Sequence, residues 1–352
     1  MGEKINYMNI LSIDTSCDET SAALTEDLKI INNIIWSQAS LHSKFGGVMP
    51  SLAQRMHEER IDFVIKKALG IKHKDFNGID AIAVTIGPGL SIALGVGVNK
   101  ARELAQKYNK KLIAVNHLEG HTLSPIANQE SLLPKIKYPA LGLVVSGKNT
   151  QLIQIKKIGD YKILAETQDD ALGEALDKAA RMLGLGYPGG AVLEKMAKLG
   201  DLKKYKLPVP VAGQEKRRIF SYSGLKTAML RLVESQQPLT KEKIYDLAAS
   251  FQNVAFIHII RVLRFILKND YPTQPHDLFV GGGVGANVEL RKRLRKLGTE
   301  FGMTIHFPYS NKLYRDNAAM VGIAAYFKAQ RKEFTNPSKI DRNPRAKIDA
   351  VI

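Results

Sequence analysis

Short apolar runs separated by polar turns dominate the first third of the chain. Three of these runs are predicted to be β-strands joined by tight turns, at residues 8–16, 21–27 and 29–38. Two helices and two further strands follow in alternation, and the pattern predicts them at residues 50–70 (helix), 80–89 (strand), 91–108 (helix) and 111–116 (strand). The predicted order is therefore three strands, helix, strand, helix, strand.

The same order recurs in the second half of the chain. Its predicted elements are strands at 140–147, 150–158 and 161–168, a helix at 171–184, a strand at 277–283, a helix at 287–298 and a strand at 304–308. A long insertion separates the first helix of this copy from its fourth strand. A duplication of this kind predicts an α/β protein with two similar lobes and a cleft between them.

The predicted domains are an N-terminal lobe over residues 1–127, a C-terminal lobe with its insertion over 128–335, and a basic tail over 336–352. The boundary between the lobes is placed in the polar, proline-punctuated stretch around residues 122–138. The tail loses hydrophobic periodicity and is rich in charge and proline, so we expect an extended or mobile segment there and not a domain.

Composition narrows the class of protein. No apolar run approaches the roughly 18 residues of a membrane span, and the first ten residues are too polar for a secretory signal peptide, so we expect a cytoplasmic protein with no membrane partner. The single cysteine, Cys17, leaves no partner for an intrachain disulfide, and any metal must be bound by His, Asp or Glu. Lys and Arg outnumber Asp and Glu by 51 to 34, and the net charge of +17 favours a polyanion such as RNA.

The sequence HLEGH places His117 and His121 four residues apart. On a helix the two imidazoles share one face and can bind one metal ion. Zinc proteases use H-E-x-x-H, in which the glutamate after the first histidine is the general base, whereas this chain has Leu118 there and Glu119 on another face. The protease interpretation therefore loses its catalytic residue, and two capping or core histidines remain the alternative.

A third metal ligand is available in the sequence YRDNAAMVG, where Asp316 and Asn317 precede an alanine-rich helix. An aspartate at this place is most often the N-cap of the helix, and that alternative stays open. A set of two histidines and one aspartate suits Fe(II) or Zn(II), with coordination positions left for a substrate oxygen.

Two turns have a composition suited to phosphate or metal. The sequence FVGGGVGAN, residues 279–287, puts glycines between a strand and a helix, where a backbone can approach an anion closely, although it has neither P-loop nor Rossmann spacing. The hairpin DTSCDET carries Asp14, Asp18 and Glu19 between two strands. These carboxylates could hold a metal-bound phosphate, and an ordinary acidic surface turn is the alternative.

Two further stretches allow a binding role and a structural one. Glu174, Asp177 and Lys178 lie on a predicted helix before a glycine turn, where a carboxylate could accept hydrogen bonds from ribose or simply form surface ion pairs. The stretch QEKRRIFSYSGLK alternates cations with Phe220 and Tyr222. Such a pattern could bind an RNA backbone and stack on unpaired bases, or could be a solvated basic loop.

Together these stretches resemble the tRNA threonylcarbamoyltransferase (TsaD) family over nearly all of residues 8–330. The resemblance is carried by IDTSCDETSAAL, GGVMPSLAQRMHEERI, TIGPGLSIALGVG, VNHLEGHTLSP, VVSGKNTQL, DDALGEALDKAARMLGLGYPGG, FSYSGLKTA, GGGVGAN and YRDNAAMVG. It implies a duplicated actin-like (ASKHA, ribonuclease H-like) two-lobe fold with a central interlobe cleft that binds an adenylate or ATP.

The resemblance also implies a reaction. The family moves the threonylcarbamoyl group from threonylcarbamoyl-adenylate to N6 of the adenosine that follows the anticodon in tRNAs reading ANN codons, which forms t6A and releases AMP. Its members work with a TsaB-like paralogue, a TsaE-like ATPase and a TsaC-like enzyme that supplies the adenylate. The alternative is a non-catalytic or ATP-hydrolysing actin-like component of a tRNA-modification complex.

The family's functional positions match named residues of this chain. His117, His121 and Asp316 match its metal ligands, with Fe(II) implied and Zn(II) as the other candidate. The remaining matches are Val144, Val145, Ser146, Gly147 and Lys148 for substrate binding, Asp177, Gly190 and Asn287 for the adenylate, and Asp18 and Glu19 for the acidic pair near the reacting group. One departure is Lys148, which stands where the family usually has glycine.

Overall fold

The structure, a computed structural model, describes residues 7–271 and 276–350, so the first six residues and the end of the tail lie outside it. The chain divides into two compact units, which are described separately. Unit 1 comprises Met1–Ile136, Ile158–Asp160 and Pro308–Ile352, and unit 2 comprises Lys137–Lys157 and Tyr161–Phe307. Each unit contains one mixed β-sheet and its own apolar core.

The sheet of unit 1 has five strands in the order β3-β2-β1-β4-β5. Their bounds are β1 (Asn9–Asp14), β2 (Glu19–Glu26), β3 (Lys29–Ser37), β4 (Ala81–Gly87) and β5 (Lys111–Asn116). The first three strands are antiparallel, whereas β4 and β5 run parallel to β1. Strands β1 and β4 are almost entirely buried, as expected for continuous apolar runs covered on both faces.

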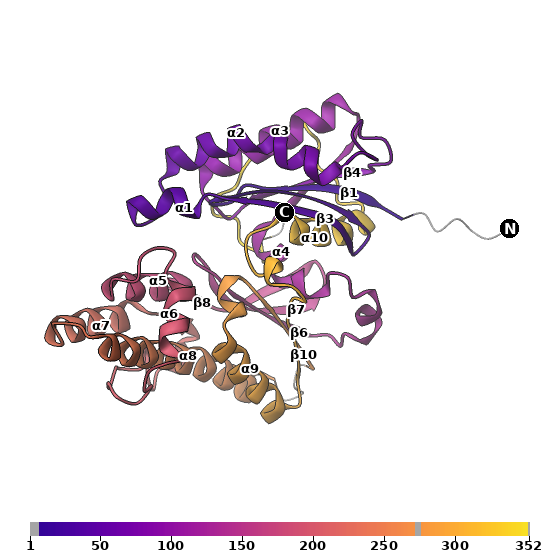
Figure 1. The fold of residues 1–352 in the computed structure, drawn as a ribbon. Helices are drawn as coiled ribbons and strands as arrows, with labels where there is room; N and C mark the ends of the chain where they lie inside the picture. The colour runs from indigo at the N-terminus through magenta and orange to yellow at the C-terminus, as the bar shows by residue number, and fades with distance from the viewer. Residues whose placement is uncertain (1–6, 272–275, 351–352) are drawn as a thin grey trace. The chain divides into compact units, whose positions relative to one another are not determined.

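Helices cover both faces of this sheet (Figure 1). The helices α2 (Pro50–Leu69) and α3 (Ser91–Lys107) lie on one face, and α10 (Ala318–Gln330) lies on the other. Gly322 brings α10 close to the strands, because a Cβ at this position would lie 2.8 Å from Thr25 Oγ1. The shorter segments of unit 1 are the helices α1 (Ala39–His42) and α4 (His117–Leu123) and the 3-10 turns Ser43–Phe45, Ser124–Ile126, Glu130–Lys135 and Asn311–Leu313.

The sheet of unit 2 has the order β11-β10-β6-β7-β8-β9. Its strands are β6 (Ala140–Val145), β7 (Thr150–Lys157), β8 (Asp160–Thr167), β9 (Ile219–Phe220), β10 (Asp277–Gly281) and β11 (Thr304–His306). The strands β11-β10-β6-β7-β8 repeat the order β5-β4-β1-β2-β3, again with an antiparallel β6–β7 pair and parallel β6–β10 and β10–β11 pairs. The predicted duplication is confirmed, and the insertion adds β9 at the edge.

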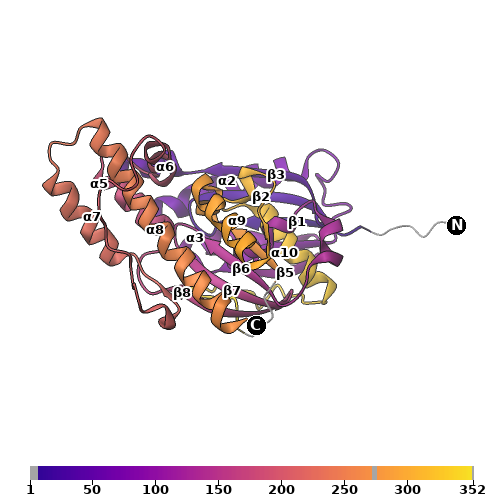
Figure 2. The same ribbon diagram turned by 90° about the horizontal axis from the view of Figure 1, so that it is seen from below.

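The helices of unit 2 pack around one long apolar helix. They are α5 (Leu172–Met182), α6 (Gly190–Ala197), α7 (Ser223–Ser235), α8 (Lys241–Asp270) and α9 (Val288–Phe301), with 3-10 turns at Glu215–Arg217 and Gly283–Ala286. The helix α8 contacts the other four (Figure 2). It is long and apolar enough to cross a membrane by length and composition, but 67% of its most apolar window is buried within the protein. Core packing therefore accounts for its composition.

The observed units differ from the predicted domain boundaries. The prediction assigned residues 308–335 to the second lobe, whereas Pro308–Ile352 belongs to unit 1 and the first segment ends at Ile136. The physical reason is that α10 returns to the sheet of unit 1, where the Ser12 hydroxyl donates to the Ala318 carbonyl at 2.7 Å. This return pairs residues about 300 positions apart, and local periodicity carries no signal for it.

The described residues of the tail, 336–350, form turns and irregular backbone with no helix or strand, and they are held against unit 1. Ile340 is buried, and the Asn343 amide donates to the Ile86 carbonyl at 2.7 Å. Further on, the side-chain amide of Asn116 donates to the Lys347 carbonyl at 3.2 Å. The tail thus crosses the Gly-Pro-Gly turn after β4 and reaches Asn116, which is the last residue of β5 and directly precedes α4.

Candidate functional site

The helix α4 begins where the buried strand β5 ends. Asn116 is its N-cap, and the side-chain oxygen accepts a hydrogen bond from the Leu118 amide at 2.8 Å. This cap makes His117 the first residue of the helix and puts His121 one turn later. Gly120 allows α4 to approach α10, because a Cβ there would lie 3.1 Å from Met320 Cγ. The two histidines therefore face the N-terminal end of α10.

The residue that caps α10 is Asn317. Its side-chain oxygen accepts from the Met320 amide at 3.1 Å, and its side-chain nitrogen donates to the Arg315 carbonyl at 2.7 Å. The sequence left open whether Asp316 is this cap. Because Asn317 fills the capping position, the Asp316 carboxylate is directed to the two histidines instead.

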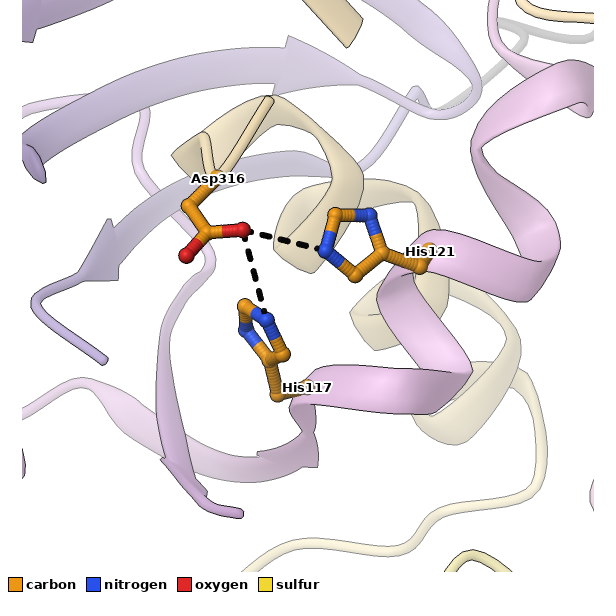
Figure 3. Close-up of side chains that lie close together, drawn as sticks. All are labelled: His117, His121 and Asp316. Carbon is orange, nitrogen blue, oxygen red and sulfur yellow. Dashed lines mark hydrogen bonds and ion pairs between the residues drawn. The ribbon is translucent and has the colours of Figure 1, made fainter. Parts of the chain in front are cut away.

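Both imidazoles point the same nitrogen at one carboxylate oxygen (Figure 3). His121 Nε2 lies 3.1 Å and His117 Nε2 lies 3.4 Å from Asp316 Oδ1, and the three ligand atoms all lie within 4.8 Å of one another. Nitrogen and oxygen ligands at about 2.0–2.2 Å from a tetrahedral metal are separated by about 3.3–3.6 Å. The donor atoms fit a metal ion in type, and the two distances to Asp316 Oδ1 are close to this separation, so this group can hold one.

The protonation states also suit a metal. Burial lowers the pKa of His121, although its hydrogen bond to Asp316 opposes the shift. Burial by itself would raise the pKa of Asp316, but the charge of His117 and the hydrogen bonds from both histidines outweigh it and hold this pKa well below its usual range. A neutral His121 imidazole beside the ionised Asp316 carboxylate is the form in which these two side chains bind a metal.

Further carboxylates surround the group. Asp14, at the end of β1, is fully buried with its Oδ1 3.9 Å from His117 Nδ1, and burial raises its pKa although the charge of His117 opposes this. Glu19 begins β2; burial and the charges of Asp18 and then Asp316 raise its pKa well above the ordinary value. So many carboxylates in one place favour a bound cation, because its charge offsets their mutual repulsion.

The protonation states predict how metal binding depends on pH. Protons compete with a metal for imidazole nitrogens, so a metal held by this group should be released as pH falls through the pKa of His121. Because burial lowers the pKa of His121, we expect the midpoint of release below about pH 6.5, the ordinary value for histidine. Metal content after dialysis at stepped pH, with circular dichroism to confirm folding, measures this midpoint. Release already near pH 8 would contradict the assignment of the ligands.

The residues predicted to bind substrate and adenylate all belong to unit 2. Val144 and Val145 are buried at the end of β6, while Gly147 and Lys148 are exposed in the turn that follows. The Ser146 amide closes this turn by donating to the Asn149 carbonyl at 2.8 Å. The turn lies beside α5, where a Cβ on Gly173 would be 2.6 Å from the Ser146 carbonyl oxygen.

The two polar residues predicted to hold the adenylate also stabilise helix ends. Asp177 Oδ1 accepts from the amides of Gly189 and Gly190, at 2.8 and 2.7 Å, at the start of α6. Asn287 caps α9 and donates to Gln252 Oε1 at 2.8 Å. The glycine turn before Asn287 packs on the end of β6, so the structure brings these predicted residues to neighbouring positions in unit 2.

The basic aromatic stretch does not form the stacking surface that its composition allowed. Phe220 and Tyr222 are fully buried in the core of unit 2, so neither ring can stack on a base. Lys226 is bound to Asp170 at 2.6 Å. In the preceding helix α5, Lys178 forms an ion pair with Glu174 at 2.7 Å, whereas Asp177 accepts from backbone amides.

Comparison with known proteins decides the family. The model for TsaD, tRNA N6-adenosine threonylcarbamoyltransferase, matches residues 29–323. This chain belongs to the TsaD family. It is 42% identical to the tRNA N6-adenosine threonylcarbamoyltransferase of Bartonella tribocorum, over 97% of this chain and 94% of that protein. It is 41% identical to the Pelagibacter ubique enzyme of the same name, over 97% and 95% of the two chains.

Solved structures of other proteins have a fold similar to that of this chain. HypF from T. kodakarensis matches with a TM-score of 0.54 at 14% identity over 93% of this chain and 48% of HypF. Full-length HypF in the phosphate- and nucleotide-bound form gives 0.57 at 13% identity over 92% and 46%. The chain spans about half the length of HypF, and the low identity limits the comparison to the fold. The predicted two-lobe actin-like fold is confirmed.

Family membership establishes the reaction. As a member of the TsaD family, the chain is an enzyme that transfers a threonylcarbamoyl group to N6 of an adenosine in tRNA and forms t6A. Transfer RNA is its substrate, in agreement with the net charge of +17. The metalloprotease interpretation, already weakened by Leu118, has no support from the relatives.

Proposed function

We propose that His117, His121 and Asp316 hold one divalent metal, Fe(II) in preference to Zn(II), at the centre of the transfer reaction. The observation that carries this proposal is the convergence of two Nε2 atoms on a single carboxylate oxygen. When bound, such an ion supplies Lewis acidity for the oxygens that gain charge as the carbamoyl group is transferred. The three side chains contribute its position, since His117 and His121 lie on the capped helix α4 and Asp316 directly precedes the cap of α10.

The adenylate part of the donor substrate is assigned to unit 2. Its proposed contacts are Val144, Val145, Ser146, Gly147, Lys148, Asp177, Gly190 and Asn287. A Cβ on Gly147 would have no neighbour within 4 Å, so a ligand can reach the backbone there. Asp177 and Asn287 hold the starts of α6 and α9 in place, because they accept hydrogen bonds from the amides of Gly190 and Glu289.

The acidic pair Asp18 and Glu19 is assigned to the incoming amine. The N6 lone pair attacks the carbamoyl carbon, the bond from that carbon to the phosphate oxygen breaks, and AMP leaves with the bonding electrons. The proton lost from N6 passes to a carboxylate of the pair. The raised pKa of Glu19 makes its carboxylate a stronger base than an ordinary one, although the group must first be ionised.

Lys148 provides a test of the adenylate site. Its side chain is exposed, and we propose that it adds a cation near the phosphate. Lys148→Met should weaken AMP binding by about fivefold, because an exposed charge pair contributes about 1 kcal/mol. It should also lower the salt dependence of binding. Lys148→Arg, which keeps the charge, serves as the control. Tighter AMP binding by Lys148→Gly would instead show that the side chain crowds the ligand.

The decisive experiment is a single-turnover assay. Purified protein is mixed with threonylcarbamoyl-adenylate and unmodified tRNA that reads ANN codons, with and without chelator. We expect chelator to abolish transfer. Added Fe(II) should then restore transfer more fully than added Zn(II). Full transfer after exhaustive removal of metal would overturn the metal assignment and leave the family assignment intact.

The resemblance to the family also suggests partners and a location. We propose a TsaB-like paralogue and a TsaE-like ATPase as partners, a TsaC-like enzyme as the source of the adenylate, and the cytoplasm as the compartment. The helix α2 supports a docking role, since Phe63 on it is 50% exposed. Assays with and without these proteins, at equal enzyme concentration, measure how far each is required.

A further inference from the structure

The hairpin that carries the acidic pair is held in place by hydrogen bonds to its carbonyls. Each of the three carbonyls before Glu19 accepts one. Two donors are backbone amides, of Leu90 at 2.8 Å and of Gln38 at 2.9 Å. The third donor is a side chain, His57 Nε2, which lies 3.0 Å from the Cys17 carbonyl oxygen. Of the three, only this contact is made by a side chain, so a substitution can remove it without changing the backbone.

His57 also holds the other side of the acidic pair. Its Nδ1 lies 2.8 Å from Thr20 Oγ1, so the ring joins the residue before Asp18 to the residue after Glu19. A carbonyl can only accept a hydrogen bond, and Nε2 is therefore the protonated nitrogen. The Thr20 hydroxyl then donates to Nδ1. Both ring nitrogens of His57 are thus used by the hairpin.

The position of His57 makes this contact rigid. The residue lies on α2 and is fully buried, and α2 packs against β2 and β3. Burial lowers the pKa of the imidazole, which keeps the neutral tautomer that both contacts require. The imidazole of His57 is thus fixed on a 20-residue helix, and it supports the four residues from Cys17 to Thr20.

We propose that His57 is a positioning residue for the transfer reaction, which directs the carboxylates of Asp18 and Glu19 by fixing the backbone on both sides of them. The inference rests on the proposed role of the acidic pair. It assigns His57 no contact with either substrate. Its effect is therefore expected on the rate of transfer and not on substrate binding, because a misplaced base reacts slowly while the ligands still bind.

The test uses His57→Leu, which fills the space without hydrogen bonds, and His57→Gln, whose amide offers both a donor and an acceptor. His57→Leu should slow single-turnover transfer on the order of tenfold, with metal content and tRNA affinity unchanged. His57→Gln should recover part of the rate. Should His57→Leu not fold, Thr20→Val removes one of the two contacts and should slow transfer by a smaller factor.

His73→Leu is the matched control. His73 is another buried histidine of unit 1 and bonds the Asn77 carbonyl at 2.8 Å. It precedes β4, whereas the hairpin follows β1, and because these strands are parallel the two sites lie at opposite ends of the sheet. A general loss of stability would slow both variants equally and would overturn the inference, whereas positioning slows only the His57 variants.

A double-mutant cycle separates this inference from the proposed function. The acidic pair is neutralised as Asp18→Asn with Glu19→Gln, and His57→Leu is tested with and without it. Positioning is supported if His57→Leu alone is slow but slows the neutralised pair little further. Positioning alone is overturned if His57→Leu transfers at the normal rate while the neutralised pair is slow. Full activity of the neutralised pair overturns the role of the acids, and positioning with it.

Discussion

His117→Ala is expected to contain no bound metal and to lose transfer activity by at least about 100-fold, since even the loss of an outer partner of a metal ligand can cost this much. The substitution removes one of two nitrogens that face Asp316 Oδ1 and leaves the other at 3.1 Å. Affinity for tRNA should survive, because it depends mainly on contacts with phosphates. Metal analysis, single-turnover transfer and tRNA binding, all on one preparation, measure the three outcomes.

Asp316→Asn should reproduce this result by a different route. The amide keeps the size of the side chain but loses the charge that a metal requires, and the cap of α10 is untouched because Asn317 provides it. Asp75→Asn is the matched control, since Asp75 is an exposed acid of the same unit outside the group. Unchanged catalysis by His117→Ala and Asp316→Asn would remove the metal from the mechanism.

Gly282→Ala is expected to destabilise unit 2 by about 3 kcal/mol or more. Gly282 has φ 87° and ψ 154°, a conformation that is essentially restricted to glycine. A Cβ there would also lie 2.7 Å from the Val145 carbonyl carbon, so backbone would have to move apart at the end of β6. Because that strand end is the proposed adenylate site, affinity for AMP should fall as well. Thermal unfolding and AMP titration measure the two effects.

The neighbouring glycine gives a matched control. Gly283 has no atom within 4 Å of the position that a Cβ would take, and its φ is not in the left-handed region. Gly283→Ala should therefore change the free energy of unfolding by no more than about 0.5 kcal/mol. Equal destabilisation by the two substitutions would show that the close approach of Gly282 to β6 is not what makes the turn sensitive.

Local patterns were sufficient to predict the strands and helices of the duplicated unit, whereas the insertion helices α6, α7 and α8 were not among the predicted elements. Alternation and helical spacing extend over a few residues, and both copies of the unit carry them, so the order of strands and helices along each copy followed from the sequence. Motifs with fixed spacing were equally informative. The histidine pair lies on one helix, and its four-residue separation already brings both rings to the same side.

Contacts between distant segments were beyond these patterns. Asp316 was indistinguishable in sequence from a helix cap until Asn317 was seen to take that place. Phe220 and Tyr222 stand in a strongly basic stretch, yet the insertion folds them into the core. Asp14 was noted as a hairpin acid, and its 3.9 Å distance from His117 emerged only from the pairing of the strands.

The sequence by itself determined the family, the reaction, the duplicated fold and the identity of the residues able to bind a metal, because each is encoded in short motifs or in local periodicity. Tertiary structure alone decided that α10 and the tail return to the first unit, that Asp316 faces two histidines, and that His57 holds the acidic hairpin. These features depend on which side chains meet after the chain has folded. Contacts between side chains tens to hundreds of positions apart produce no periodic pattern in a single sequence.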